Sequence, residues 1–146
     1  MGSKLYTSEH RIRFSECDPA GIVFYPQYFI MFNDLLEQWI DSMVPEGFSS
    51  VIAQKKVGMP TVNLQADFRS ISKMGDDVVL SIGVKKIGSR SLQLRLQCVG
   101  KDGVLRMEVQ QVIVTTSLVT HQAIEIPEFL RDPMQAYLLE DEAITA

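Results

Sequence analysis

The chain has 146 residues, a length that favours one domain, and we expect residues 1–146 to form a single folded unit. Hydrophobic residues make up 46% and charged residues 22%, an ordinary globular composition that excludes a mainly disordered or collagen-like chain. The formal net charge of −4 has the wrong sign for a general nucleic-acid binder. No apolar run reaches the roughly 20 residues that a membrane helix needs.

The start of the chain and its few cysteines and histidines limit the expected chemistry. The segment Met1 to Tyr6 contains no apolar signal core, so we expect the protein in the cytoplasm. Cys17 and Cys98 are too few to define a disulfide scaffold, and we expect both to be reduced. His10 and His121 are far apart in sequence and no Cys/His cluster has zinc spacing, so we expect no metal site.

The predicted elements begin with a strand and a long helix. Residues 10–14 alternate, with Ile12 and Phe14 on one face, which predicts a strand. From Pro26 the apolar residues recur at three- and four-residue steps, which predicts a helix with one apolar stripe. The stripe consists of Phe29, Phe32, Leu36, Trp39, Ile40 and Met43. Pro26 suits a first helical position, and Gly47 lies where this helix should have ended.

Four strand-like runs follow a short helical stretch at residues 49–55. The runs are residues 62–68, 78–84, 92–98 and 104–118, which alternate or are rich in β-branched side chains. A weaker helix at residues 126–139 is interrupted at Pro133. This order predicts an α+β fold in which an antiparallel sheet of about five strands, the last four forming a meander, wraps around one long central helix.

The most informative segment is Glu16-Cys17-Asp18-Pro19-Ala20-Gly21-Ile22-Val23-Phe24-Tyr25-Pro26-Gln27-Tyr28. It places a carboxylate at a strand end and then leads, through uncharged residues, into a helix N-terminus. Pro19 biases Asp18 toward an extended backbone, which limits where the carboxylate can point. Tyr25 offers no short side-chain acceptor to the first-turn N–H groups. Those amides need water, the Asp18 side chain or a ligand oxygen as a partner, and a ligand that becomes negative would suit the helix dipole.

This segment resembles the Asp-Pro-Ala-Gly-Ile-Val-aromatic-Tyr-Pro signature of the 4-hydroxybenzoyl-CoA thioesterase family, a branch of the hotdog-fold acyl-CoA thioesterases. The order of elements from about His10 to Leu118 is similar to that fold. The resemblance implies that Asp18 is the catalytic carboxylate, as nucleophile or as base for water, and that the backbone N–H of Tyr25 polarises the thioester carbonyl. It also implies a substrate-binding set, which is Gly21, Pro26, Tyr28, Met59, Pro60, Thr61, Arg90 and Ser91.

Within this set the resemblance divides the roles. Residues 59–61 fall where the family lines the acyl pocket, and Arg90 falls in a strand turn that meets the CoA phosphates. The family member acting on 4-hydroxybenzoyl groups has a denser basic cluster at that turn and an acidic residue in place of Asn33. No separate cofactor is implied, because coenzyme A is part of the substrate. The resemblance further implies a homo-oligomer, a dimer or a tetramer, with the site between subunits.

Thioester chemistry is compatible with these few groups. An alkyl thiolate leaves without an obligatory strong acid, so a catalytic histidine is not required. Attack on the carbonyl and stabilisation of the oxyanion need only one carboxylate and one or two helix N-terminal N–H groups. The sequence therefore predicts an acyl-CoA thioesterase that hydrolyses an aromatic, hydroxybenzoyl-like, or other acyl-CoA to the free acid and CoA, with no nucleic-acid or membrane partner.

Two other functions stay open on sequence grounds. A hotdog enoyl-CoA hydratase or dehydratase needs a histidine positioned with a carboxylate, and neither His10 nor His121 lies in such a sequence context. A non-catalytic acyl-CoA-binding module of the same fold would not require Asp18. Among other candidate groups, Cys17 is expected to be a small buried side chain, and Glu37 on the helix is a fallback carboxylate, as is Glu16. The basic residues that we consider for phosphate contacts are Lys55, Lys56, Lys73, Lys85, Lys86 and Arg90.

Overall fold

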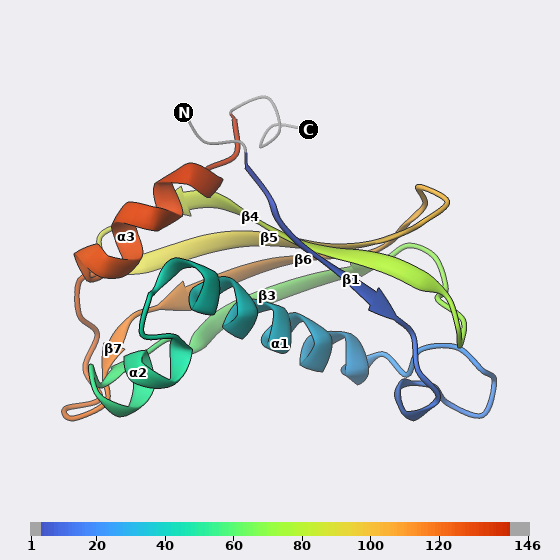
Figure 1. Ribbon diagram of the computed structural model, residues 1–146, viewed down its shortest axis with the longest axis horizontal. Helices are drawn as coiled ribbons and strands as arrows, with labels where there is room; N and C mark the ends of the chain where they lie inside the picture. The colour runs from blue at the N-terminus through green and yellow to red at the C-terminus, as the bar shows by residue number, and fades with distance from the viewer. Residues whose placement is uncertain (1–3, 141–146) are drawn as a thin grey trace.

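The computed structural model describes residues 4–140 and shows a five-stranded antiparallel sheet packed on a long helix (Figure 1). The strands of this sheet are β1 (Tyr6–Arg11), β3 (Thr61–Phe68), β4 (Asp77–Ile87), β5 (Ser91–Gly100) and β6 (Leu105–Val114). The helices are α1 (Pro26–Met43), α2 (Phe48–Ala53) and α3 (Glu128–Met134), with 3-10 turns at Phe14–Glu16 and Gln135–Tyr137. The short strands β2 (Val57–Gly58) and β7 (Thr116–Ser117) pair with each other. The predicted α+β fold, a sheet around a central helix, is confirmed.

The strand order is β1-β4-β5-β6-β3, so β3 pairs with β6 and not with β4. The predicted four-stranded meander is therefore wrong, although β4, β5 and β6 do follow one another as hairpins. The connection from β3 to β4 is too long for a hairpin turn, and the N–H groups of Arg69 and Ser70 bond to the carbonyl of Arg106 at 2.9 and 3.1 Å. This crossover leaves β3 at the outer edge of the sheet.

Three predicted elements have different bounds in the structure. The first strand ends at Arg11, and Ile12 and Phe14 do not share a face, because Ile12 is buried whereas Phe14 lies 80% exposed in a 3-10 turn. The predicted strand 104–118 breaks at Thr115, whose N–H bonds to the carbonyl of Arg90, and its last part pairs with β2. The predicted helix 126–139 is the shorter α3 followed by a 3-10 turn.

Helix α1 begins at Pro26 and ends at Met43, as predicted, and its apolar side fills the inner face of the sheet. Its buried residues are Tyr28, Met31, Phe32, Leu35, Leu36, Trp39 and Ile40. The opposing sheet residues alternate in burial along β5, which is the pattern of a strand with one face in the core. Each large apolar side chain buried in this way stabilises the fold by about 1.5–3 kcal/mol. Gly47 follows the helix with φ of 86°, a left-handed conformation that glycine adopts readily.

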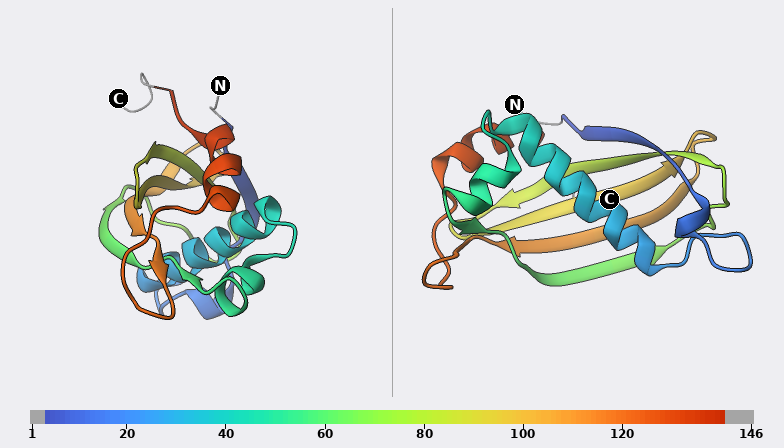
Figure 2. Two further views of the ribbon diagram at one scale, coloured as in Figure 1. Left: turned by 90° about the vertical axis from the view of Figure 1, so that its left-hand side faces the viewer. Right: turned by 60° about the horizontal axis from the view of Figure 1, so that its bottom comes forward.

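The long axis of α1 defines two ends of the molecule (Figure 2). The helix-start end holds the blue loop before α1 and the connection between β3 and β4, residues 69–76. The turn end holds the β4–β5 turn, α2, β2, β7 and α3. Across residues 4–140, no helix is long and apolar enough to cross a membrane. Residues 1–3, which belong to the segment assessed for an export signal, and residues 141–146 lie outside the described part.

Candidate active site

Asp18 lies in a tight turn just before α1. The turn is closed by the N–H of Gly21, which donates to the carbonyl of Asp18 at 2.9 Å, and Gly21 has φ of 80°. The side chain of Asp18 is half-buried, and its Oδ1 accepts the N–H of Ala20 at 2.8 Å. No described residue donates a hydrogen bond to its Oδ2. The turn therefore restrains the carboxylate while leaving one of its oxygens available for chemistry.

The start of α1 has no side-chain cap and no acidic residue in its first turn. Tyr25 is the N-cap residue, with φ of −53° and ψ of −36°, and within residues 4–140 no acceptor is found for its N–H. The carboxylate of Asp18 bonds to Ala20 and not to an amide of α1, so the alternative in which Asp18 caps the helix is wrong. The N–H groups of Gln27 and Tyr28 donate to the carbonyls of Phe24 and Tyr25 at 2.8 and 3.2 Å, and Pro26 has no N–H. At the positive end of the helix dipole, the N–H of Tyr25 is therefore the amide left for an anionic or polarised oxygen.

A cavity of about 270 Å³ adjoins the start of α1. It is lined by Ile22, Val23, Tyr28, Phe68, Arg69, Ser70, Ile71 and Ser72. Phe68 meets the exposed ring of Tyr25 edge to face at 6.0 Å between centroids. The hydroxyl of Tyr28 donates to Oγ of Ser72 at 2.9 Å, and burial raises the pKa of Tyr28 above its usual value. Tyr28 therefore offers this cavity an aromatic ring rather than an ionisable hydroxyl.

A second cavity, of about 360 Å³, lies between α1 and the outer strand β3. Thr61 and Asn33 both line it, together with apolar residues of α1 and β3. Nε2 of Gln111 donates to Oγ1 of Thr61 at 2.7 Å, which fixes the threonine hydroxyl on the cavity wall. Of the three residues predicted for an acyl pocket, Thr61 is the one that borders this cavity.

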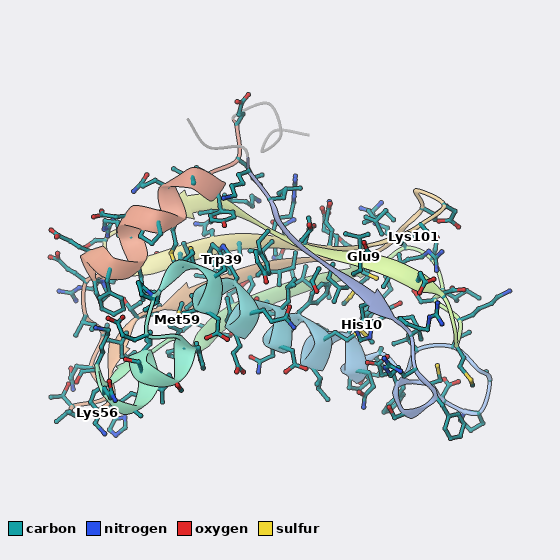
Figure 3. All side chains as sticks on the ribbon, in the orientation of Figure 1. Glu9, His10, Trp39, Lys56, Met59 and Lys101 are labelled. Atoms are coloured by element: carbon teal, nitrogen blue, oxygen red, sulfur yellow. The ribbon has the colours of Figure 1, made fainter. Side chains whose placement is uncertain are left out.

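The remaining predicted residues lie at the turn end, far from Asp18 in the same chain. The carbonyl of Pro60 accepts the N–H of Val114 at 3.1 Å, and that of Arg90 accepts the N–H of Thr115 at 3.0 Å, so these segments are neighbours. Figure 3 shows Met59 and Lys56 at this end and His10 at the other. The 8 residues of β3 cover roughly 26 Å, and the 18 residues of α1 about 27 Å. One chain does not bring Arg90 to Asp18.

The β4–β5 turn that carries Arg90 is held from behind by α3. Nη2 of Arg131 donates to the carbonyls of Gly88 and Ser89 at 2.7 and 3.1 Å. The side chain of Arg90, in the same turn, is exposed. Among the basic residues considered for phosphate binding, Lys73 is separate, because it pairs with Ile22 at the helix-start end. The sequence did not predict that Arg131 holds the β4–β5 turn, since nothing in the neighbouring residues distinguishes it from a solvated helix residue.

The structure pairs His10 with a carboxylate, contrary to the sequence-based expectation. Its Nε2 lies 3.0 and 2.9 Å from the two carboxylate oxygens of Glu16, and Oε1 of Glu16 also accepts the N–H of Arg13 at 2.8 Å. The pair borders a cavity of about 130 Å³ whose lining does not include Asp18 or Tyr25. The expectation failed because β1 and the 3-10 turn fold back on each other, which no local pattern indicates.

The two cysteines are unsuited to act as thiolates. Sγ of Cys17 lies 3.4 Å from the carbonyl of Arg13, and burial, together with the charges of Glu16 and Asp18, raises its pKa. Cys98 is fully buried, which raises its pKa to about 12. Both side chains therefore stay protonated near neutral pH, and Asp18 is the stronger candidate nucleophile. Over residues 4–140 the structure groups no three His, Cys, Asp or Glu side chains that would hold a metal ion.

Sequence comparison identifies the class of protein to which this fold belongs. The model of the thioesterase-like superfamily matches residues 12–134, so the chain belongs to this superfamily. The 4-hydroxybenzoyl-CoA thioesterase of Pseudomonas sp. (strain CBS-3) is 28% identical over 98 residues, which are 61% of this chain and 64% of that protein. The chain thus matches slightly less than two thirds of that enzyme's length. The 1,4-dihydroxy-2-naphthoyl-CoA hydrolase of Prochlorococcus marinus (strain MIT 9211) is 26% identical over 125 residues, 80% of this chain and 75% of that protein.

Solved structures of the hotdog type share the fold. Slr0204, a 1,4-dihydroxy-2-naphthoyl-CoA thioesterase from Synechocystis, superposes with a TM-score of 0.81 and 17% identity over 90% of this chain and 96% of that chain. A mutant 4-hydroxybenzoyl CoA thioesterase complexed with 4-hydroxybenzoyl CoA gives a TM-score of 0.78 and 22% identity over 87% and 96%. At these identities the likeness establishes the architecture, and the chemistry has to be argued from the residues.

Proposed function

We propose that this protein is an acyl-CoA thioesterase that uses Asp18 and the backbone N–H of Tyr25. Either the carboxylate attacks the thioester carbonyl directly, or it takes a proton from a water molecule that attacks the carbonyl. In both cases the N–H stabilises the oxyanion that forms. The C–S bond then breaks, and CoA leaves as a thiolate that takes up a proton. On the direct route, water then cleaves the mixed anhydride formed with Asp18 and frees both the acid and the carboxylate. On the other route, the attacking water has already supplied the second oxygen of the acid. The observation that carries this proposal is the N–H of Tyr25, unpartnered within residues 4–140, at an uncapped helix start beside the turn that holds Asp18.

The surroundings of the helix start favour an aromatic acyl group. The cavity of about 270 Å³ is lined by the rings of Tyr28 and Phe68 and by aliphatic side chains. Rings pack well edge to face or offset against other rings, so a benzoyl-like group gains contact there. The relatives named for hydroxybenzoyl and dihydroxynaphthoyl thioesters agree with this substrate class. We therefore place a hydroxybenzoyl-like thioester first and a short alkyl thioester second.

We further propose that the active protein is at least a dimer formed through β3. This outer strand leaves Val62, Leu64 and Phe68 between 42% and 60% exposed, and the neighbouring Ile30 of α1 is 52% exposed. An apolar, unpaired sheet edge invites a second strand. Antiparallel pairing about a two-fold axis would set the helix-start end of one chain beside the turn end of its copy. A CoA ester reacting at Asp18 would then meet Arg90 of the second chain.

The pair of His10 and Glu16 supports a second candidate function, an enoyl-CoA hydratase. Such an enzyme needs a histidine held by a carboxylate, and the two side chains are in hydrogen-bond contact. Their cavity is separate from the turn of Asp18 and the N–H of Tyr25. A non-catalytic binding module is the third alternative, and it predicts no product at all.

Thiol release from a panel of acyl-CoA esters tests these functions. The panel should contain benzoyl, hydroxybenzoyl, short alkyl, long alkyl and enoyl esters, with free thiol and enoyl absorbance measured together. Asp18→Asn should lower turnover by about two orders of magnitude or more while the protein stays folded. Glu37→Gln changes the fallback carboxylate, which is exposed on α1, and should leave turnover unchanged. Wild-type turnover in Asp18→Asn would refute the assignment, and loss of enoyl absorbance without thiol release would establish the hydratase.

A further inference from the structure

Ser72 connects the turn of Asp18 to the first turn of α1. It is 1% exposed and lies between β3 and β4. Its Oγ accepts the hydroxyl of Tyr28 at 2.9 Å, and its carbonyl accepts the N–H of Val23 at 3.0 Å. Two residues later, the N–H of Met74 donates to the carbonyl of Gly21 at 2.9 Å. The segment from Ser72 to Met74 therefore holds both groups of the proposed reaction, the carboxylate turn and the helix start.

Arg106 in turn holds this segment. Arg106 is 8% exposed. Its Nη1 donates to the carbonyl of Ile71 at 3.1 Å, to Oγ of Ser72 at 3.4 Å and to Oδ2 of Asp76 at 3.0 Å. Nη2 donates to both carboxylate oxygens of Asp102 at 3.3 and 3.2 Å. A planar guanidinium reaches all of these acceptors from one position, which the single ammonium group of a lysine does not. A buried arginine with so many local acceptors fixes their mutual positions.

We propose that Arg106 is a positioning residue for the thioesterase reaction, acting through Ser72 to set the distance between the Asp18 carboxylate and the N–H of Tyr25. This inference rests on the proposed function, because it takes that carboxylate and that amide as the reacting groups. Arg106 itself touches neither group. Its bond to Ser72 leads to Tyr28, whose N–H donates to the carbonyl of Tyr25, and to Val23, which follows the turn of Asp18. Its removal should loosen a geometry that rate depends on steeply, since small misplacements of reacting groups cost large factors in rate.

If the ion pairs of Arg106 only stabilised the fold, removing Arg106 would have a different kinetic effect from the loss of a positioning residue. Loss of stability alone would lower the amount of folded protein but leave kcat per folded molecule unchanged. Loss of positioning lowers kcat in molecules that are folded. KM should change less than kcat, because the proposed CoA-binding groups at the turn end are untouched, although Ile71 and Ser72, which Arg106 contacts, line the cavity at the helix start. Arg95 on β5 is a matched control, since its Nε lies 4.0 Å from a carboxylate oxygen of Glu108 and its side chain is 20% exposed.

The experiment compares Arg106→Ala and Arg95→Ala, each with and without millimolar guanidinium, at a temperature where both are folded. Arg106→Ala should lose roughly ten- to a hundredfold in kcat with a smaller change in KM, and guanidinium should restore part of the lost kcat by binding between the carboxylates of Asp76 and Asp102. Arg95→Ala should show neither effect. If Arg106→Ala does not fold, Ser72→Ala takes its place and should show a smaller loss of kcat without rescue.

Amide hydrogen exchange adds a readout that needs no activity. Exchange in residues 18–28 should accelerate in Arg106→Ala and slow again with guanidinium, while the core of β5 stays unchanged. Wild-type kcat in folded Arg106→Ala, or exchange that rises evenly along the chain, would overturn the positioning role. If wild-type protein releases thiol from no ester, the proposed function fails by itself, and the exchange pattern still decides whether Arg106 orders the helix start.

Discussion

The sharpest prediction concerns the separation of the two halves of the candidate site. Asp18 lies at the helix-start end and Arg90 at the turn end, and the 8 residues of β3 separate these ends by roughly 26 Å. If the active site is shared between two chains, mutations in these halves should complement each other. We therefore propose to mix Asp18→Asn protein with Arg90→Glu protein after dissociation and reassociation, and to measure thiol release at low substrate concentration.

The expected recovery equals the fraction of sites that receive both an intact Asp18 and an intact Arg90. Each shared site takes its Asp18 from one chain and its Arg90 from another, and with random mixing each of the two contributions is intact about half of the time. About a quarter of the sites should then be fully wild type, so the mixture should regain about a quarter of the wild-type kcat/KM. This fraction is the same for a dimer and a tetramer, because it depends only on the two chains that build one site. Each variant alone should stay close to its own low value.

The control is Asp18→Asn protein alone, carried through the same dissociation and reassociation steps. If the two residues served one site within a single chain, every site in the mixture would carry one of the two mutations, and no recovery would occur. A mixture with no more activity than the mean of its two components, from protein shown by light scattering to be oligomeric, would refute the shared site. Monomeric wild-type protein with full activity would refute it as well.

Three further predictions follow from the local geometry. Tyr25→Pro removes the N–H at a residue whose φ of −53° suits proline, so kcat should fall by about a hundredfold or more with little change in melting temperature, whereas Tyr25→Ala, which keeps the N–H, should retain most activity. The N–H groups of Lys73 and Val104, together with Arg106, lower the pKa values of Asp76 and Asp102. Their contribution to stability is therefore full above the usual aspartate pKa of about 3.9 and is lost as pH falls through the depressed values, so melting temperature should hold from pH 7 to about pH 5 and drop below about pH 4. The Cys98 thiol, with its pKa raised to about 12, should not react with a disulfide reagent at pH 8 until the protein is unfolded, and early reaction would contradict its burial.

Local patterns were enough to predict most elements. The limits of α1 were predicted because proline at the first turn and glycine beyond the end are local signals, and the apolar period reports one buried face. Strand β5 followed from alternation, since one of its faces is buried along its whole length. Strand β4 followed from its alternating apolar residues, although both of its faces are buried from Leu80 to Val84. The uncapped start of α1 was also readable, because a tyrosine before Pro26 has no short acceptor.

The tertiary structure decided how these pieces are brought together. The pairing of β3 with β6, the contact of His10 with Glu16 and the bonds of Arg106 to residues 71–76 join segments by long-range contacts or by chain reversals, and no side-chain period encodes a partner. The placement of Asp18 and Arg90 at opposite ends of the sheet is of the same kind. Periodicity reports which face of an element is buried, because burial acts on each residue separately, whereas strand order depends on how all elements share one core.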